Sequence, residues 1–126
     1  MHITFLLTGV FALMLCALTI KVIKLRLKHK VTLGDGNKKD LKTMIRIHGN
    51  FTEYAPLLIL IIACIEIADF SRFFACTLAT IAFFSRLMHV WALKTSNTRY
   101  PAMIATFTVL LVGGGLSFLA ALGITF

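Results

Sequence analysis

Apolar residues form four long runs along the chain, at residues 3–23, 55–68, 73–93 and 102–126. The first, third and fourth runs each come close to the ~20 residues that a helix needs to cross the hydrocarbon core of a bilayer. The second run reaches that length only if its helix begins near His48, among polar residues. The pattern predicts an all-α integral membrane protein, a four-helix bundle in one domain over residues 1–126, with transmembrane helices at about residues 2–26, 41–68, 71–94 and 100–125.

The composition agrees with a membrane protein. Hydrophobic residues make up 59% of the chain and charged residues 14%, whereas soluble domains carry roughly 25% charged residues. A cleaved signal peptide is an alternative explanation of the first apolar run. However, no basic residue precedes the run, and the nearest ones, Lys21, Lys24 and Arg26, follow it. We therefore expect this segment to be retained as the first helix.

Basic residues are concentrated in one part of the chain. Of the thirteen lysines and arginines, nine lie between Lys21 and Arg46, in the first loop and the helix ends beside it. Lys94 and Arg99 flank the third loop, and the second loop is short and nearly neutral. Because basic loops mark the cytoplasmic side, loops 1 and 3 are predicted to be cytoplasmic and both termini to lie on the opposite side. The net charge of +8 is thus explained by topology, and nucleic-acid binding is not indicated.

Turn and helix signals refine the boundaries. The GDGN sequence in the first loop predicts a turn, and Asp40 is a candidate N-cap for the second helix. Pro56 should kink that helix, because proline lacks the N–H group and its ring clashes with the preceding turn. Pro101 fits the first turn of the fourth helix. The small residues Gly113, Gly114 and Gly115 should allow close helix approach.

Cysteine and histidine do not indicate a metal site. The three cysteines, Cys16, Cys64 and Cys76, fall inside apolar runs without CxxC spacing, and we expect them to be small buried apolar residues. No two of the four histidines have the i, i+4 spacing of a zinc site, so no metal is predicted.

The second helix begins with a polar stretch, RIHGNFTEYAP. At ~100° per residue, Arg46, Asn50 and Glu53 fall within about 60° of one another on one face of a helix. One explanation is structural: Arg46 and Glu53 form an internal charge pair, and Asn50 satisfies a backbone group. The other is a binding site for a small zwitterionic or multiply charged ligand, because arginine binds carboxylates, glutamate accepts from ammonium groups and asparagine binds amides.

Two further cations are predicted toward the cytoplasmic side. Arg86 lies deep in the otherwise apolar third helix, three residues before His89, and Arg99 lies just before the fourth helix. For Arg86, ligand contact and a salt bridge to Glu53 or Glu66 both remain open. Glu66 should lie near the opposite face of the membrane, which favours Glu53. We interpret His89 as a buried hydrogen-bonding residue rather than an acid or base.

The polar stretch also resembles a family signature. The pattern R-x-x-x-N-x-x-E-Y-x-P is similar to that of the MAPEG family, the membrane-associated proteins in eicosanoid and glutathione metabolism, and here it is formed by Arg46, Asn50, Glu53, Tyr54 and Pro56. The resemblance covers the whole chain: its length, four spans, a basic first loop, and an R-x-P element that opens the fourth helix at Arg99, Tyr100 and Pro101.

The resemblance implies a homotrimer that binds glutathione, as a co-substrate, between subunits near the cytoplasmic side. The implied binding residues on the second helix are Arg46, Asn50, Glu53 and Tyr54, with Arg26 assisting from the end of the first helix. The resemblance also implies that Arg99 activates the glutathione thiol as the catalytic residue. A nearby cation lowers the thiol pKa, and the thiolate attacks an electrophile dissolved in the bilayer.

The third helix departs from the family pattern. Eicosanoid-type members have tyrosines there that approach the tripeptide, whereas this chain has none, and Arg86 and His89 are the candidates to replace them. The compact sequence looks closer to the prokaryotic branches, which implies a bacterial inner membrane.

Two function classes follow from these residues. The first is a microsomal-type glutathione transferase, with peroxidase activity toward lipid hydroperoxides as a variant. The second is a non-enzymatic membrane protein that binds a charged small molecule or lipid headgroup on the same scaffold. Only the enzyme needs a thiolate activator, so Arg99 distinguishes them. A transporter is disfavoured, because no pair of broken helices is evident.

Overall fold

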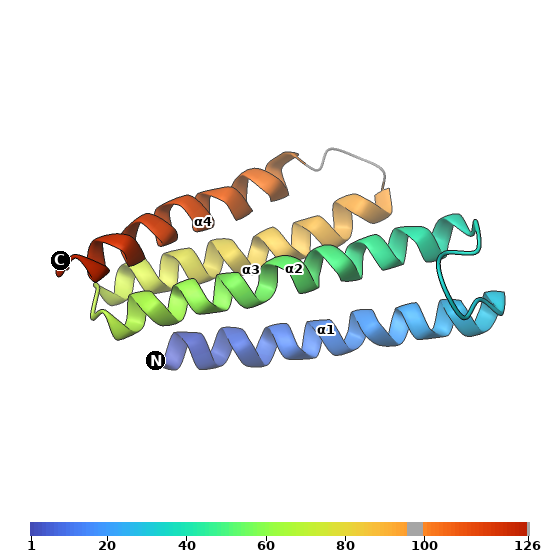
Figure 1. Ribbon diagram of the computed structural model, residues 1–126, viewed down its shortest axis with the longest axis horizontal. Helices are drawn as coiled ribbons and strands as arrows, with labels where there is room; N and C mark the ends of the chain where they lie inside the picture. The colour runs from blue at the N-terminus through green and yellow to red at the C-terminus, as the bar shows by residue number, and fades with distance from the viewer. Residues whose placement is uncertain (96–99, 126) are drawn as a thin grey trace.

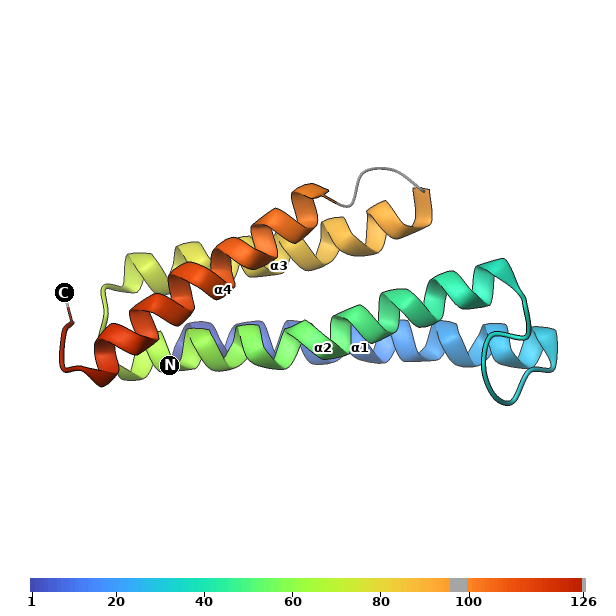
Figure 2. The same ribbon diagram turned by 45° about the horizontal axis from the view of Figure 1, so that its top comes forward.

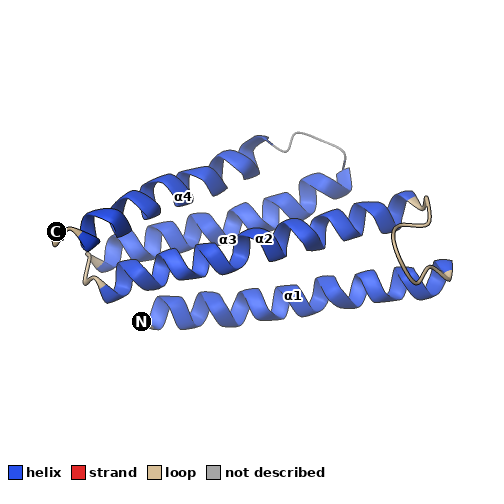
Figure 3. Ribbon diagram, in the orientation of Figure 1, coloured by secondary structure: helices blue, strands red, loops and turns tan. Residues whose placement is uncertain are grey.

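The computed structural model describes residues 1–95 and 100–125, with the side chains of residues 93–95 left out. The described chain folds into four helices: α1 (His2–His29), α2 (Lys39–Ile67), α3 (Arg72–Thr95) and α4 (Tyr100–Ala121). Figure 1 shows them lying side by side in a bundle, with both termini at the end opposite the α1–α2 loop. Figure 3 shows helices joined by loops throughout the described part of the chain. All four helices are long and apolar enough to cross a membrane, which confirms the prediction of an all-α protein with four spans.

The helix ends differ in detail from the sequence-based boundaries. Helix α1 continues to His29 and stops at Lys30, which has a left-handed conformation with φ 54°. The prediction that Asp40 is the N-cap of α2 is wrong. The cap is Lys38, without a side-chain bond. The Asp40 carboxylate instead accepts hydrogen bonds from the Leu41 N–H at 2.9 Å and pairs with His29 Nε2 at 2.8 Å, so it joins the ends of α1 and α2.

The fourth helix starts as expected, with Pro101 in its first turn. It ends at Ala121, four residues before the expected limit, and Gly123 follows in a left-handed conformation with φ 75°. Within α2, Pro56 does not interrupt the helix. The course of α2 bends near its middle, as Figure 2 shows, which agrees with the kink predicted for an internal proline.

Helix α2 is the centre of the bundle and packs against each of the other three helices. Its buried face carries Leu58, Ile62 and Ile65, and its Phe51 meets Phe11 of α1 edge-to-face with ring centroids 5.4 Å apart. Helix α4 approaches α2 closely at Gly113, where an added methyl group would overlap with Ile61 Cγ2. The expected role of the glycines in close packing is therefore confirmed for Gly113.

The other two glycines of that triplet do not make such contacts within the chain. An added methyl group at Gly114 or Gly115 would meet no atom within 4 Å. The outer surface of the helices is rich in exposed large apolar side chains, as expected where lipid is the solvent. The expectation that all three cysteines are buried is wrong for Cys16 and Cys76, because both are exposed on this apolar surface, and Cys64 is only half-buried.

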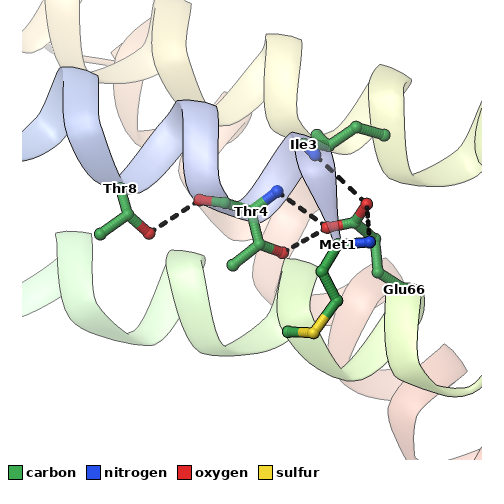
Figure 4. A network of polar contacts seen from close by, with 5 residues as sticks. All are labelled: Met1, Ile3, Thr4, Thr8 and Glu66. Carbon is green, nitrogen blue, oxygen red and sulfur yellow. Dashed lines mark hydrogen bonds and ion pairs between the residues drawn. The ribbon is translucent and has the colours of Figure 1, made fainter.

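A cluster of polar contacts joins the start of α1 to the end of α2, and Figure 4 shows it. The Glu66 carboxylate accepts hydrogen bonds from the Ile3 N–H at 3.2 Å, from the Thr4 N–H at 2.8 Å and from the Thr4 hydroxyl at 2.6 Å. It also pairs with the amino group of Met1 at 3.2 Å. The carboxylate thus caps the N-terminus of α1, where free N–H groups and the helix dipole favour a negative charge. We call these residues the Glu66 cluster.

Candidate functional site

The polar stripe of α2 borders a cavity. Asn50 is half-buried, while Arg46 and Glu53 are exposed one turn to either side of it. The cavity has a volume of about 400 Å³, and its lining comes from α2, α3 and α4: Ile45, Arg46, Gly49, Asn50, Glu53, His89 and Met103. This volume lies within the range of roughly 300–1,000 Å³ that is usual for small-molecule sites.

The two charges of the stripe do not neutralise each other. Among the described residues, Arg46 and Glu53 form no ion pair, either together or with another group. The purely structural explanation of the stripe required such a pair, so the geometry favours the binding-site explanation. A cation, an anion and an amide lie together at the edge of one cavity.

Arg86 is the most deeply buried cation described, with 2% of its surface exposed. Its guanidinium donates hydrogen bonds to Asn50 Oδ1 at 2.9 Å, to Ser85 Oγ at 3.3 Å and to the hydroxyl of Thr106 on α4. The same group lies over the ring of Tyr54, 5.3 Å from its centroid. We call Asn50, Tyr54, Arg86 and Thr106 the Arg86 cluster, which ties α2, α3 and α4 together.

The salt bridge between Arg86 and Glu53 that the sequence favoured is absent from the described chain. The reason is geometric, because Asn50 occupies the position on α2 that meets the guanidinium, whereas the Glu53 side chain is exposed. Glu66, the other candidate partner, accepts a hydrogen bond from Thr4 of α1 instead. A buried arginine without a carboxylate partner is costly, and neutral acceptors and an aromatic ring offset only part of that cost.

Arg86 does not border the cavity but lies behind residues that line it, next to a much smaller space. The space beside its guanidinium amounts to about 10 Å³, which suffices for about one water molecule at most. Arg86 and Tyr54 line this small space, not the larger cavity. His89 borders both spaces and is buried, as the sequence analysis expected. The binding residues implied by the resemblance are thus arranged in two layers, with Asn50 belonging to both.

The remaining two site residues lie elsewhere. Arg26, near the end of α1, donates hydrogen bonds to the carbonyl groups of Thr32 at 3.2 Å and Gly34 at 3.1 Å, so it holds the first loop. It borders neither of the two cavities at the stripe. Arg99 falls outside the residues that the structure describes.

Sequence reasoning missed Thr106, the partner of Arg86 on α4. Its hydroxyl also donates a hydrogen bond to the carbonyl group of Ala102 at 2.8 Å. A signal was available, because Thr106 lies on the one stripe of α4 that is buried, together with Ala102, Val109, Gly113 and Leu116. Threonines elsewhere in these helices make the same backbone bond on exposed faces, so the residue type alone could not identify it.

Comparison with known proteins adds two findings. Residues 4–122 of the chain match the MAPEG family. The chain is also similar to inner membrane protein YecN of Escherichia coli strain K12, with 31% identity over 103 residues that cover 80% of this chain and 79% of the relative. The protein of the same name from Escherichia coli O6:H1 strain CFT073 matches equally well.

Proposed function

We propose that this chain, which belongs to the MAPEG family, is a membrane-bound glutathione transferase that conjugates glutathione to lipophilic electrophiles or reduces lipid hydroperoxides with it. The family includes glutathione transferases. The observation that carries the proposal is the cavity beside α2, where Arg46, Asn50 and Glu53 lie together without an ion pair between the two charges.

The charges of this site complement those of glutathione. The tripeptide carries two carboxylates, one ammonium group and two amide bonds. Arg46 would bind a carboxylate, Glu53 would accept from the ammonium group, and Asn50 would bind the peptide backbone. Arg86 adds a positive charge behind the wall, without a carboxylate partner among the described residues. This surplus of positive charge favours a ligand that is anionic overall.

The proposed reaction needs a thiolate. The thiol of glutathione loses its proton to solvent, and the sulfur then attacks the electrophile, forming a carbon–sulfur bond as the leaving group departs with its electron pair. The family resemblance gives Arg99 the role of stabilising the thiolate. A site within a membrane bundle is useful for this chemistry, because a water-soluble nucleophile can meet an electrophile that is dissolved in lipid.

The proposal extends to assembly and orientation. We propose a homotrimer in which a neighbouring subunit completes the wall of the cavity, and Arg26 approaches the ligand there. The exposure of Arg46 and Glu53 in the single chain agrees with a site that needs a second surface. We further propose a bacterial inner membrane, by extension from the name of the relative YecN, with the basic first loop on the cytoplasmic side.

The test combines binding and turnover on protein purified in detergent. Calorimetry with glutathione should show affinities about tenfold or more weaker for Arg46→Ala and Glu53→Ala, because each removes a charge-assisted contact. Arg99→Ala should keep much of the binding but abolish conjugation of chlorodinitrobenzene. Arg72→Ala is the matched control, because Arg72 is an exposed arginine at the other end of the bundle and should change neither quantity.

Two results would reject the proposal. If saturating glutathione gives neither conjugation nor thiolate absorbance with the wild-type protein, the non-enzymatic alternative is favoured. Equal loss of binding in Arg46→Ala, Glu53→Ala and Arg99→Ala would reject the separate role assigned to Arg99.

A further inference from the structure

We infer that Asn50 presents its amide NH₂ group to an acceptor oxygen of the ligand, and that Arg86 and Thr106 are positioning residues that hold Asn50 in this orientation. The inference deepens the proposed function and rests on it for the identity of the ligand. It gives the Arg86 cluster a role in specificity, although Arg86 does not border the larger cavity.

The orientation of Asn50 follows from hydrogen-bond chemistry. A guanidinium group has five N–H donors and no acceptor, so the atom of Asn50 that faces it must be the carbonyl oxygen. The distance from Arg86 Nη1 to Asn50 Oδ1 is 2.9 Å. Because the amide is planar, the NH₂ group lies on the opposite branch and points away from Arg86.

The NH₂ group of Asn50 is available to a ligand. Asn50 borders both the small space at Arg86 and the larger cavity. The small space holds about 10 Å³ and the larger cavity about 400 Å³. Only the larger cavity can hold a ligand, and within the described part of the chain the NH₂ group has no hydrogen-bond partner. Asn50 thus has free donors beside the cavity, whereas its carbonyl oxygen is engaged by Arg86.

Thr106 on α4 is a further hydrogen-bond partner that holds Arg86 in place. Its hydroxyl donates to the carbonyl group of Ala102 at 2.8 Å, so it can meet Arg86 only as an acceptor. Arg86 then donates to Asn50, and Asn50 donates to the ligand. The donations run outward from Arg86 in two directions: through Asn50 to the ligand, and through Thr106 to the carbonyl group of Ala102 on α4. Reversing the amide of Asn50 would place its NH₂ group against the guanidinium.

The consequence for recognition is a preference for acceptor groups. The carboxylates and amide carbonyl oxygens of glutathione can accept from Asn50, whereas a ligand group with only N–H donors would compete with Arg86 for the carbonyl oxygen. Asn50→Asp separates the two functions of the side chain. The nearly isosteric carboxylate can still accept from Arg86, and more strongly because it is charged. It has lost both donors and repels an anionic ligand.

The experiment measures glutathione affinity and thermal stability together, on full-length protein in detergent. Asn50→Asp should retain or increase the melting temperature while its affinity for glutathione falls about tenfold or more. Asn50→Ala should lose both stability and affinity. A purely structural Asn50 would give Asn50→Asp wild-type affinity, and that result would overturn the inference.

Thr106 is tested with a matched substitution on the same helix. Thr106→Val should weaken glutathione binding several-fold, because Arg86 loses an acceptor and its guanidinium is free to shift, while Thr106→Ser keeps the hydroxyl and should restore the affinity. Thr108→Val is the control, because the Thr108 hydroxyl donates to the Ile104 carbonyl on an exposed face. Equal effects of Thr106→Val and Thr108→Val would overturn the positioning role.

The two proposals can fail separately. If the wild-type protein does not bind glutathione, the proposed function is rejected. The melting temperature of Asn50→Asp still tests the orientation of Asn50. A lower melting temperature for Asn50→Asp than for the wild type would reject that orientation. If the wild-type protein binds glutathione and Asn50→Asp binds it equally well, only the inference falls.

Discussion

The Glu66 cluster and the Arg86 cluster both hold a charged side chain between helices, partly buried for Glu66 and buried for Arg86, yet they differ in what they leave for a ligand. In the Glu66 cluster, both carboxylate oxygens receive donors from α1, so the hydrogen-bonding capacity is used within the protein. In the Arg86 cluster, the guanidinium is satisfied but the NH₂ group of Asn50 is not, and a cavity lies beside it. A cluster whose hydrogen-bonding groups are all used within the protein only joins helices. A cluster that leaves a donor without a partner can also bind a ligand.

The charges of the two clusters differ in the same way. The Glu66 anion is balanced by the amino group of Met1 and by the N-terminus of α1. Arg86 has no carboxylate within ion-pairing distance among the described residues. An unbalanced buried cation raises the local potential, and this favours an anionic group in the adjoining cavity. The contrast supports the proposal that an anionic ligand binds beside the Arg86 cluster.

The largest effect on stability should come from Glu66→Ala. The substitution removes the acceptor of three donors at the start of α1, and we expect a loss of about 2–3 kcal/mol in the free energy of unfolding. Denaturation in detergent measures this loss. Glutathione affinity should remain within twofold of the wild type, and a large drop in affinity would mean that the two clusters are not independent.

Gly113→Ala should have an intermediate effect and should disturb only the Arg86 cluster. The added methyl group overlaps with Ile61 and pushes α4 away from α2, at a cost of about 1–3 kcal/mol. Because Thr106 lies on α4, glutathione affinity should fall as well. Gly114→Ala is the control, since no atom lies within 4 Å of the new methyl group and alanine favours the helix. Similar stability losses in both variants would contradict the close approach at Gly113.

The smallest effect should come from Tyr54. Its ring lies under the Arg86 guanidinium, and a cation–π contact depends on the ring and not on the hydroxyl. Tyr54→Phe should therefore change the free energy of unfolding by less than about 0.5 kcal/mol. Tyr54→Leu should lose about 0.5–2 kcal/mol, measured by the same denaturation. If Tyr54→Phe is as unstable as Tyr54→Leu, the hydroxyl and not the ring supports Arg86.

The sequence predicted the four spans well, because about twenty consecutive apolar residues have few alternatives to a membrane helix. It was less accurate at the ends of helices. Asp40 has the residue type of an N-cap, but the N-cap of α2 is Lys38, two residues earlier, and Asp40 pairs with His29 of α1. A pairing between residues on two helices is a tertiary contact, and a local capping rule does not include it.

The candidate site was predicted in part. Helical periodicity alone brought Arg46, Asn50 and Glu53 to one stripe, and all three border the cavity. Periodicity could not choose a partner for Arg86, because that choice depends on the height and rotation of α3 against α2. The favoured partner was Glu53, and the actual partner is Asn50. Thr106 was missed for the same reason, since it comes from a third helix.

The sequence by itself determined the membrane location of the four helices and the family, because hydrophobic length and a local motif are properties of consecutive residues. It also determined which residue types the polar stripe of α2 carries. Only the tertiary structure decided which of them satisfy one another. The carboxylate of Glu66 accepts hydrogen bonds from the start of α1, and the hydrogen bond from Arg86 turns the NH₂ group of Asn50 toward the cavity. A hydrogen bond between side chains of two helices needs a donor on one helix facing an acceptor on the other. That pairing is decided only when the helices pack together.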